Sequence, residues 1–118
     1  MFGFKKKDKD FALVLGERKN YLAIFEILIG LLKKSENFGQ AKIIENLVIL
    51  IQREDWQLFD KLINGVNMWG GSGAVWEVNI QDEAEYKKFQ REIIHLINLM
   101  ERTKILGNGV KRIRKLFE

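Results

Sequence analysis

The sequence predicts a mainly α protein, a small bundle of four to five helices, and three observations support this fold class. The chain has 118 residues and no proline, the residue that breaks helix interiors. Apolar residues recur at helical spacing over much of its length. A glycine-rich turn at positions 70–73 separates two helical parts. Apolar and polar residues alternate weakly over positions 74–80, so it stays open whether a short β segment forms there.

The length and composition indicate a single helical domain covering residues 1–118. Hydrophobic residues make up 47% of the chain and charged residues 31%, which is ordinary globular composition. The absence of cysteine excludes a disulfide framework and a thiolate metal site. The apolar run 21–32 is interrupted by Glu26 and is shorter than the ~20 residues of a membrane-spanning helix. No signal-peptide pattern follows the first residues, so we expect a cytoplasmic protein.

The net charge of +4 is concentrated in two basic tails, at about 1–15 and 107–118. Residues 1–20 carry six basic and three acidic side chains, and residues 101–118 carry six and two. The intervening body has eight basic and eleven acidic residues and is mildly acidic. Such tails can bind phosphates or acidic surfaces, although solubility alone also explains basic termini.

The first two helices are expected at residues 16–35 and from about residue 38 onward. Asn37 and Gln40 have the spacing of a capping box, in which each side chain satisfies a free backbone amide at the start of the second helix. The apolar stripe predicted to be buried in that helix consists of Ile43, Ile44, Leu47, Leu50 and Ile51.

A third helix is expected after Asp55, which is a suitable N-cap, and Gly65 is expected to end it. Three structures are open for the segment 74–80, which follows the glycines. It pairs as a strand with residues 11–15, pairs with another chain, or is a loop.

The fourth helix is expected to begin at Asp82, which forms a second capping box with Glu85, and to continue to about Leu106. Residues 107–109 are expected to end it, and residues 110–117 to form a short basic helix.

The glycine-rich turn is the most informative feature, because glycine clusters mark positive φ or close backbone approach. We expect at least one of its glycines to have positive φ, Trp69 or Trp76 to pack on the core, and Gly71→Val to lower the melting temperature. No lysine and hydroxyl residue follow as in a phosphate-binding loop. The candidate binding residues here are Trp69, Gly70, Gly71, Ser72, Gly73, Trp76 and Glu77.

No catalytic residue, metal site or cofactor is predicted. His95, the only histidine, lies beside the apolar stripe of the fourth helix, where a structural role is expected. The carboxylates of Asp82, Glu83 and Glu85 are explained by their place at a helix start, and no histidine lies near them in the sequence.

The segment 37–78 resembles an uncharacterised bacterial family of small helical proteins. In that family, two or three helices precede a Gly-Gly-Met-Gly-Ser-Leu-Asn-Asp-Leu-type turn, and residues 70–78 here match its three glycines and its hydrophobic positions. The family's Asn-Asp pair is replaced by Trp76 and Glu77. The resemblance implies a single-domain cytoplasmic protein and, through the association of some members with polymorphic toxins, an immunity protein.

The prediction for function is therefore a non-enzymatic protein-binding module, with a toxin among the expected partners. One alternative is nucleic-acid binding through Lys111, Arg112, Arg114 and Lys115, assisted by Lys5, Lys6, Lys7 and Lys9. The other is peripheral contact with an anionic membrane through Phe2, Phe4, Ile113, Leu116, Phe117 and the neighbouring cations. Homo-oligomer formation is left open.

Overall fold

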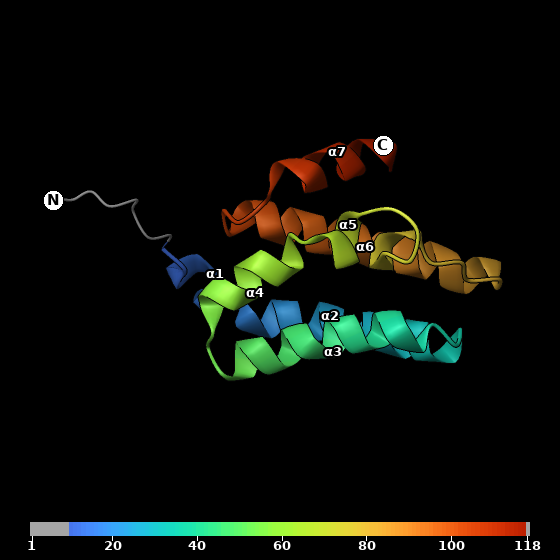
Figure 1. Cartoon of the computed structure of the whole chain (residues 1–118), viewed down its shortest axis with the longest axis horizontal. Helices are drawn as coiled ribbons and strands as arrows, with labels where there is room; N and C mark the ends of the chain where they lie inside the picture. The colour runs from blue at the N-terminus through green and yellow to red at the C-terminus, as the bar shows by residue number, and fades with distance from the viewer. Residues whose placement is uncertain (1–9, 118) are drawn as a thin grey trace, which may run out of the picture.

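Helices make up most of the structure, a computed structural model in which residues 10–117 are described (Figure 1). The elements are α1 (Ala12–Gly16), α2 (Arg18–Lys34), α3 (Phe38–Gln52), α4 (Trp56–Ile63), α5 (Val66–Trp69), the 3-10 turn η1 (Val75–Glu77), α6 (Glu83–Arg102) and α7 (Asn108–Leu116). Five helices in this part of the chain have eight residues or more, so the predicted mainly α bundle is confirmed. The N-terminal Phe2, Phe4, Lys5, Lys6, Lys7 and Lys9 lie outside the described residues.

The helices are arranged around an α2–α3 hairpin, whose two members are joined by a turn of three residues (Figure 1). α6 packs along α2, and the short helices α4 and α5 follow α3. α7 contacts both α6 and α5, so the basic C-terminal helix lies against the body. Its Val110 and Ile113 are buried.

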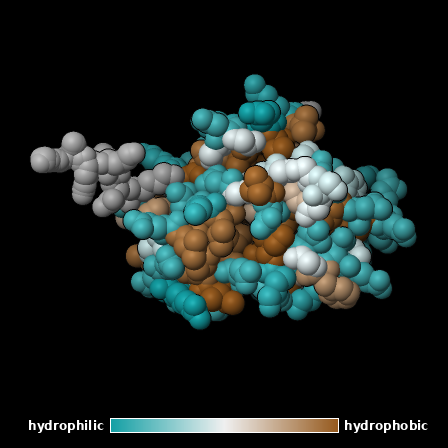
Figure 2. All heavy atoms as spheres, in the orientation of Figure 1, coloured by the Kyte–Doolittle hydropathy of each residue, from teal (hydrophilic) through white to brown (hydrophobic). Residues whose placement is uncertain are grey.

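Apolar side chains gather near the centre of the face shown in Figure 2, over α4 and α3. Two exposed residues spaced four apart on α4 form an apolar stripe: Leu58 is 39% exposed and Leu62 38%. Side chains four apart lie on the same face of a helix, so this stripe points away from the core that Phe59 and Ile63 enter. Val66, at the start of α5, is 79% exposed.

The core is centred on a cluster of aromatic rings from α2 and α4. The rings of Tyr21 and Phe59 meet edge to face with centroids 5.4 Å apart, and Phe25 lies 6.3 Å from Phe59. All three side chains are fully buried. Aromatic pairs in this geometry contribute about 0.5–1.5 kcal/mol beyond their burial, so the cluster fixes how α2 and α4 meet.

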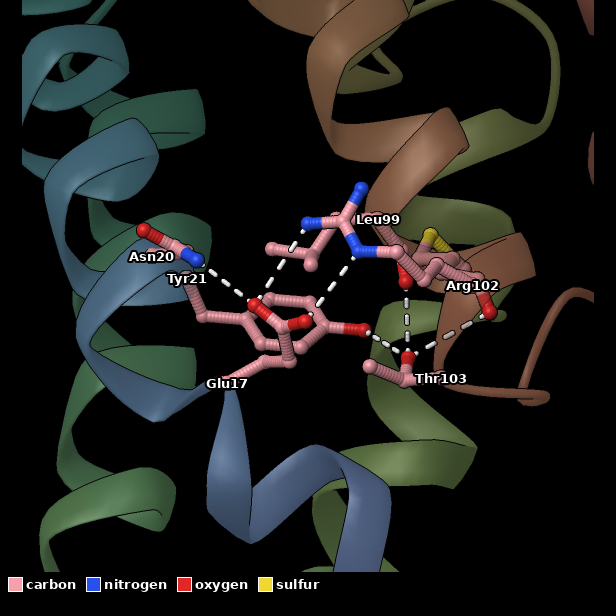
Figure 3. Close-up of polar contacts among 7 residues, drawn as sticks. Glu17, Asn20, Tyr21, Leu99, Arg102 and Thr103 are labelled. Atoms are coloured by element: carbon pink, nitrogen blue, oxygen red, sulfur yellow. Dashed lines mark hydrogen bonds and ion pairs between the residues drawn. The ribbon is translucent and has the colours of Figure 1, made fainter.

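Tyr21 also joins α2 to the end of α6 through a buried hydrogen bond (Figure 3). Its hydroxyl lies 2.7 Å from Thr103 Oγ1, and the Thr103 hydroxyl donates to the carbonyl of Leu99 at 2.8 Å. Beside this pair, Arg102 Nε lies 3.1 Å from Glu17 Oε2 at the start of α2. A buried bond and a solvent-facing ion pair thus hold the same two helices in register.

Two of the predicted helix caps are confirmed at the level of single hydrogen bonds. Asp55 Oδ1 accepts from the amide of Leu58 at 3.4 Å, and Asp82 Oδ1 accepts from the amide of Glu85 at 2.9 Å. The reciprocal half of the box predicted for Asp82 and Glu85 is wrong, because the Glu85 carboxylate binds Lys34 at 2.5 Å and accepts no hydrogen bond from the Asp82 amide among the described residues. The bond to Glu85 raises the pKa of Lys34.

The capping box predicted for Asn37 and Gln40 is wrong. The Asn37 side chain makes no cap; its amide donates to Ser35 Oγ at 2.8 Å and to the carbonyl of Asn79 at 3.3 Å. Gln40 Nε2 donates to the carbonyl of Gly73 at 2.9 Å. Both side chains are engaged by loop backbone distant in the sequence, which a local pattern does not contain.

The third helix ends where Gly65 was expected to stop it, since α4 ends at Ile63 and Asn64 is its C-cap. Gly65 itself has φ −83° and stands before α5, so the stop does not use a left-handed glycine. α6 ends at Arg102, not near Leu106, and Gly107 precedes α7.

Residues with a side chain take the positive-φ position after three of the helices. These are Glu36 with φ 64°, Glu54 with φ 57° and Lys104 with φ 65°. After each, the next amide donates to a carbonyl five residues back; the Ile105 amide, for example, lies 2.9 Å from the carbonyl of Met100. This is the Schellman closure, and in it glycine is the favoured residue at the positive-φ position.

The segment 74–80 is a loop in the structure. It contains the 3-10 turn Val75–Glu77, and no strand occurs within residues 10–117. Pairing with residues 11–15 is excluded because Ala12–Gly16 is helical. Val75, Val78 and Ile80 are buried, and their placement explains the weakly alternating pattern without a β ladder.

We expect Tyr21→Phe to lower the free energy of unfolding by about 1 kcal/mol at neutral pH, because a buried hydrogen bond is lost. The melting temperature should fall by roughly 4 °C. Burial raises the pKa of the Tyr21 hydroxyl above its ordinary 10.0. The stabilisation is therefore complete below pH 10.0 and is lost at higher pH, where only the unfolded tyrosine ionises readily.

Chemical denaturation of both proteins from pH 7 to 11 measures this difference. The gap between wild type and Tyr21→Phe should shrink above pH ~10. A gap that stays constant over the whole range would contradict the assigned role of the phenol.

Lys104→Gly should stabilise the protein by about 0.5–1 kcal/mol, because glycine adopts positive φ without steric cost. Lys104→Ala is the matched control, since alanine removes the same charge and keeps the Cβ. Thermal melts should place only the glycine variant above wild type; equal melting temperatures for the two variants would show that the backbone position is not strained.

Candidate functional site

The glycine loop is tied to the core by Trp69. This side chain is buried, and its Nε1 donates to the carbonyl of Ile63 at 2.6 Å. Gly73 has φ 89°. The expectations that one loop glycine has positive φ and that a tryptophan packs on the core are both confirmed. Trp69 therefore holds the loop in place and presents little surface to a ligand.

Trp76 closes the other side of the loop. Its Nε1 donates to the carbonyl of Gly70 at 2.9 Å, and its ring meets Phe117 at a centroid distance of 6.4 Å and an angle of 74°. The side chain is half-buried. Trp76 thus connects the loop to the end of α7, although no pattern in the sequence links these two segments.

A pocket of about 320 Å³ lies where η1, α6 and α7 meet. Two of its lining residues, Trp76 and Glu77, come from the predicted loop set, and Leu116 and Phe117 come from the C-terminal segment. Gly70, Gly71, Ser72 and Gly73 do not line it. Its α6 side is formed by Tyr86 and Gln90.

Tyr86 and Gln90 were missed from the sequence, although their spacing of four places both on one helix face. Tyr86 is 37% exposed. In the sequence Tyr86 belongs to the apolar stripe of this helix, so nothing indicated that its side chain is exposed.

The four cations of α7 differ in their surroundings. Arg114 is partly buried, with Nη2 2.7 Å from Glu101 Oε1, and the pairing lowers the pKa of Glu101. The Nε and Nη2 atoms of Arg114 are buried without hydrogen-bond geometry to any described residue. Lys111, Arg112 and Lys115 are exposed. Three of the four predicted basic residues are therefore available to a partner.

One exposed cation of α7 lies on the helix face that borders the pocket, and two more lie on the same helix. Arg112 and Leu116 are four residues apart and share a face of α7, and Leu116 is 67% exposed. We call the set Trp76, Tyr86, Leu116, Phe117, Lys111, Arg112 and Lys115 the α7 surface. It combines an aromatic hollow, an unpacked leucine and positive charge.

The carboxylates and the histidine considered in the sequence do not come together. The Asp82 and Glu85 side chains act at the start of α6 and on Lys34, and Glu83 lies 3.6 Å from Lys87. His95 is on α6 near Glu92, with Nδ1 and Oε1 3.5 Å apart. Within residues 10–117 no group of three or more His, Cys, Asp or Glu side chains is placed to hold a metal ion.

Comparisons with known proteins give no match for the chain. No protein-family model matches it, and neither a curated protein nor a solved structure matches it. The resemblance of residues 70–78 to a bacterial helical family therefore stays a prediction. What the protein binds is inferred from the shape and charge of its own surface.

The loop glycines should respond differently to substitution. A Cβ on Gly70 would lie 2.7 Å from the carbonyl oxygen of Val66, and Gly73 needs positive φ, whereas a Cβ on Gly71 meets nothing within 4 Å. We expect Gly70→Ala and Gly73→Ala each to cost on the order of 1 kcal/mol or more and Gly71→Ala to be nearly neutral. The loss of stability expected from the sequence for Gly71→Val is therefore expected at Gly70 and Gly73 instead.

Thermal melts of the three alanine variants measure this order. Equal loss in all three would mean that the loop is more tightly packed than the structure describes. No loss in any of them would show that the glycines are not needed for the fold.

Proposed function

We propose that the protein is a non-enzymatic protein-binding module that contacts its partner through the α7 surface. The observation that supports this most directly is Leu116, which is 67% exposed beside Trp76 and Phe117. Tryptophan, tyrosine and arginine are the residues most enriched among the strong contacts of protein interfaces. Trp76, Tyr86 and Arg112 supply all three within this one surface.

The charge of the surface indicates an acidic partner segment with an apolar anchor. The apolar anchor would fill the pocket, and its acidic neighbours would face Lys111, Arg112 and Lys115. Complementary charge of this kind raises association rates and excludes basic partners. A toxin with an acidic docking face is one partner of this description, in keeping with the predicted immunity role.

Nucleic-acid binding is the second candidate, because the same three exposed cations can neutralise phosphates. Three phosphate contacts would give a slope of about −2.7 in log K against log salt, which describes weak, non-specific binding. The cations could also attract an anionic membrane surface. Among the described residues, no helix is long and apolar enough to cross a bilayer.

Association between copies of the chain stays open. The exposed Leu58 and Leu62 of α4, with Val66 at the start of α5, are the apolar residues that such contact would use.

The proposal is tested by affinity capture from the native host with full-length wild type, Leu116→Asp and Leu13→Asp. Leu13 is 45% exposed on α1, so it provides the same substitution away from the α7 surface. A stoichiometric protein partner should be captured by wild type and Leu13→Asp and lost by Leu116→Asp, because a carboxylate cannot enter an apolar contact without a large desolvation cost. Capture of no such partner, or one that Leu116→Asp retains, would count against the proposal.

A charge-removal variant separates the two candidate functions. Replacing Lys111, Arg112 and Lys115 by glutamine should weaken binding to the captured protein mainly by slowing association. Titration of wild type with a labelled duplex DNA at low salt is the parallel measurement. Tight DNA binding that the triple variant abolishes, with no protein partner, would favour nucleic acid.

A further inference from the structure

A second surface lies on the opposite flank of α6, in an open groove against α2. Its volume is about 520 Å³. α2 contributes Ala23, Ile24 and Ile27, and α6 contributes Leu99, so the floor is mainly apolar. Asn20, Glu92, His95, Asn98 and Arg102 complete the lining.

Glu92 is unusual in this groove because its side chain is only 10% exposed. The nearest charged group is His95, whose Nδ1 lies 3.5 Å from Oε1, and Glu92 accepts no hydrogen bond from the described residues. Lys88, one helical turn earlier, makes no ion pair with it within residues 10–117. The surroundings of this mostly buried side chain are less polar than those of an exposed acid, so a cation entering the groove would gain more from pairing with Glu92 than with an exposed carboxylate.

Arg102, the cation at the end of the groove, does not pair with Glu92. Arg102 Nε and Nη2 lie 3.1 and 3.4 Å from the two oxygens of Glu17 (Figure 3). Asn20 Nδ2 also donates to Glu17, at 2.6 Å. The side-chain carbonyl of Asn20 takes no part in this hydrogen bond. The charge of Arg102 is thus directed to Glu17.

We propose that this groove binds an arginine side chain presented by an extended segment of a partner protein. The guanidinium would pair with Glu92, and its aliphatic stem would lie on Ile24, Ile27 and Leu99. Arginine fits better than lysine because its planar guanidinium is less strongly hydrated and binds carboxylates through two parallel bonds. The groove is open along two helices and not enclosed, which suits a continuous chain more than a free small molecule.

This site is independent of the α7 surface. The α7 surface lies on the flank of α6 that carries Gln90 and Glu101, and the groove lies on the flank that carries Glu92 and Leu99. One surface offers positive charge and the other a buried negative charge. Substitutions in one therefore leave the other intact.

The test uses full-length protein labelled with ¹⁵N and titrated with the peptide acetyl-Ala-Leu-Arg-Leu-Ala-amide. A second peptide carries citrulline, which keeps the shape of arginine and removes its charge. The arginine peptide should shift the amide signals of Ala23, Ile27, His95 and Asn98, and the citrulline peptide should bind at least about tenfold more weakly.

Glu92→Gln should abolish the difference between the two peptides, because it removes only the charge. Glu26→Gln is the matched control: it removes the same charge from an exposed site on α2, in the separate groove formed with α3. A third variant, Ala23→Phe, fills the groove from an exposed position and should block the arginine peptide without unfolding the protein.

The proposal is overturned if the two peptides bind wild type equally or if Glu92→Gln binds the arginine peptide as tightly as wild type does. Methylguanidinium alone provides the last comparison. If it binds as tightly as the peptide, the groove is a small-cation site and the docking of a protein segment is wrong. Loss of the captured partner in Leu116→Asp has no bearing on these titrations, so failure of the α7 proposal is recognised separately.

Discussion

The hydrogen bond between Tyr21 and Thr103 is the contact on which the arrangement of the long helices depends. Tyr21 belongs to the aromatic cluster of α2 and α4, and its hydroxyl is bonded where α6 ends. One side chain therefore links three helices through two kinds of interaction. Asn20 and Arg102, the sequence neighbours of Tyr21 and Thr103, line the groove between α2 and α6, so the groove lies beside this bond.

Side-chain amides hold the non-helical parts of the chain. Asn64 Nδ2 donates to the carbonyl of Ile105 at 2.9 Å, and its Oδ1 accepts from the amide of Gly107 at 2.9 Å. The start of α7 is thereby attached to the end of α4. Gln40 does the same for the glycine loop through Gly73. Since buried backbone polar groups need partners, these amides allow irregular segments to pack against the core.

The features that could be predicted from the sequence are those that depend on residues close together in the chain. Apolar spacing located the five longer helices but not α1 or α5, and the caps at Asp55 and Asp82 were correct because each bond spans three residues. Asn37 and Gln40 were misassigned because they are bonded to residues more than thirty positions away. The end of α6 was missed because Lys104 adopts a positive φ that favours glycine, whereas the first helix was correctly expected to end near residue 35.

In the candidate sites, too, contacts between residues distant in the sequence could not be predicted. The sequence supplied Trp76 and Glu77, and it supplied the C-terminal cations, but it gave no reason to place them together. Only packing brings Trp76 to Phe117 and shows that Arg114, unlike Arg112, is engaged by Glu101. The sequence does not distinguish Glu92 from the other carboxylates of a charged helix, because its burial depends on packing against α2.

α6 separates two surfaces of opposite charge, and this division follows from helical geometry. Residues 90 and 101 lie on the flank that meets α7, whereas residues 92 and 99 lie on the flank that meets α2. α7 brings a cluster of cations to the first flank, and α2 removes Glu92 from water on the second. The net charge of +4 conceals this arrangement. A partner that used both surfaces would need acidic and basic segments separated by the width of one helix, about 10 Å, and such a requirement is more selective than either surface alone.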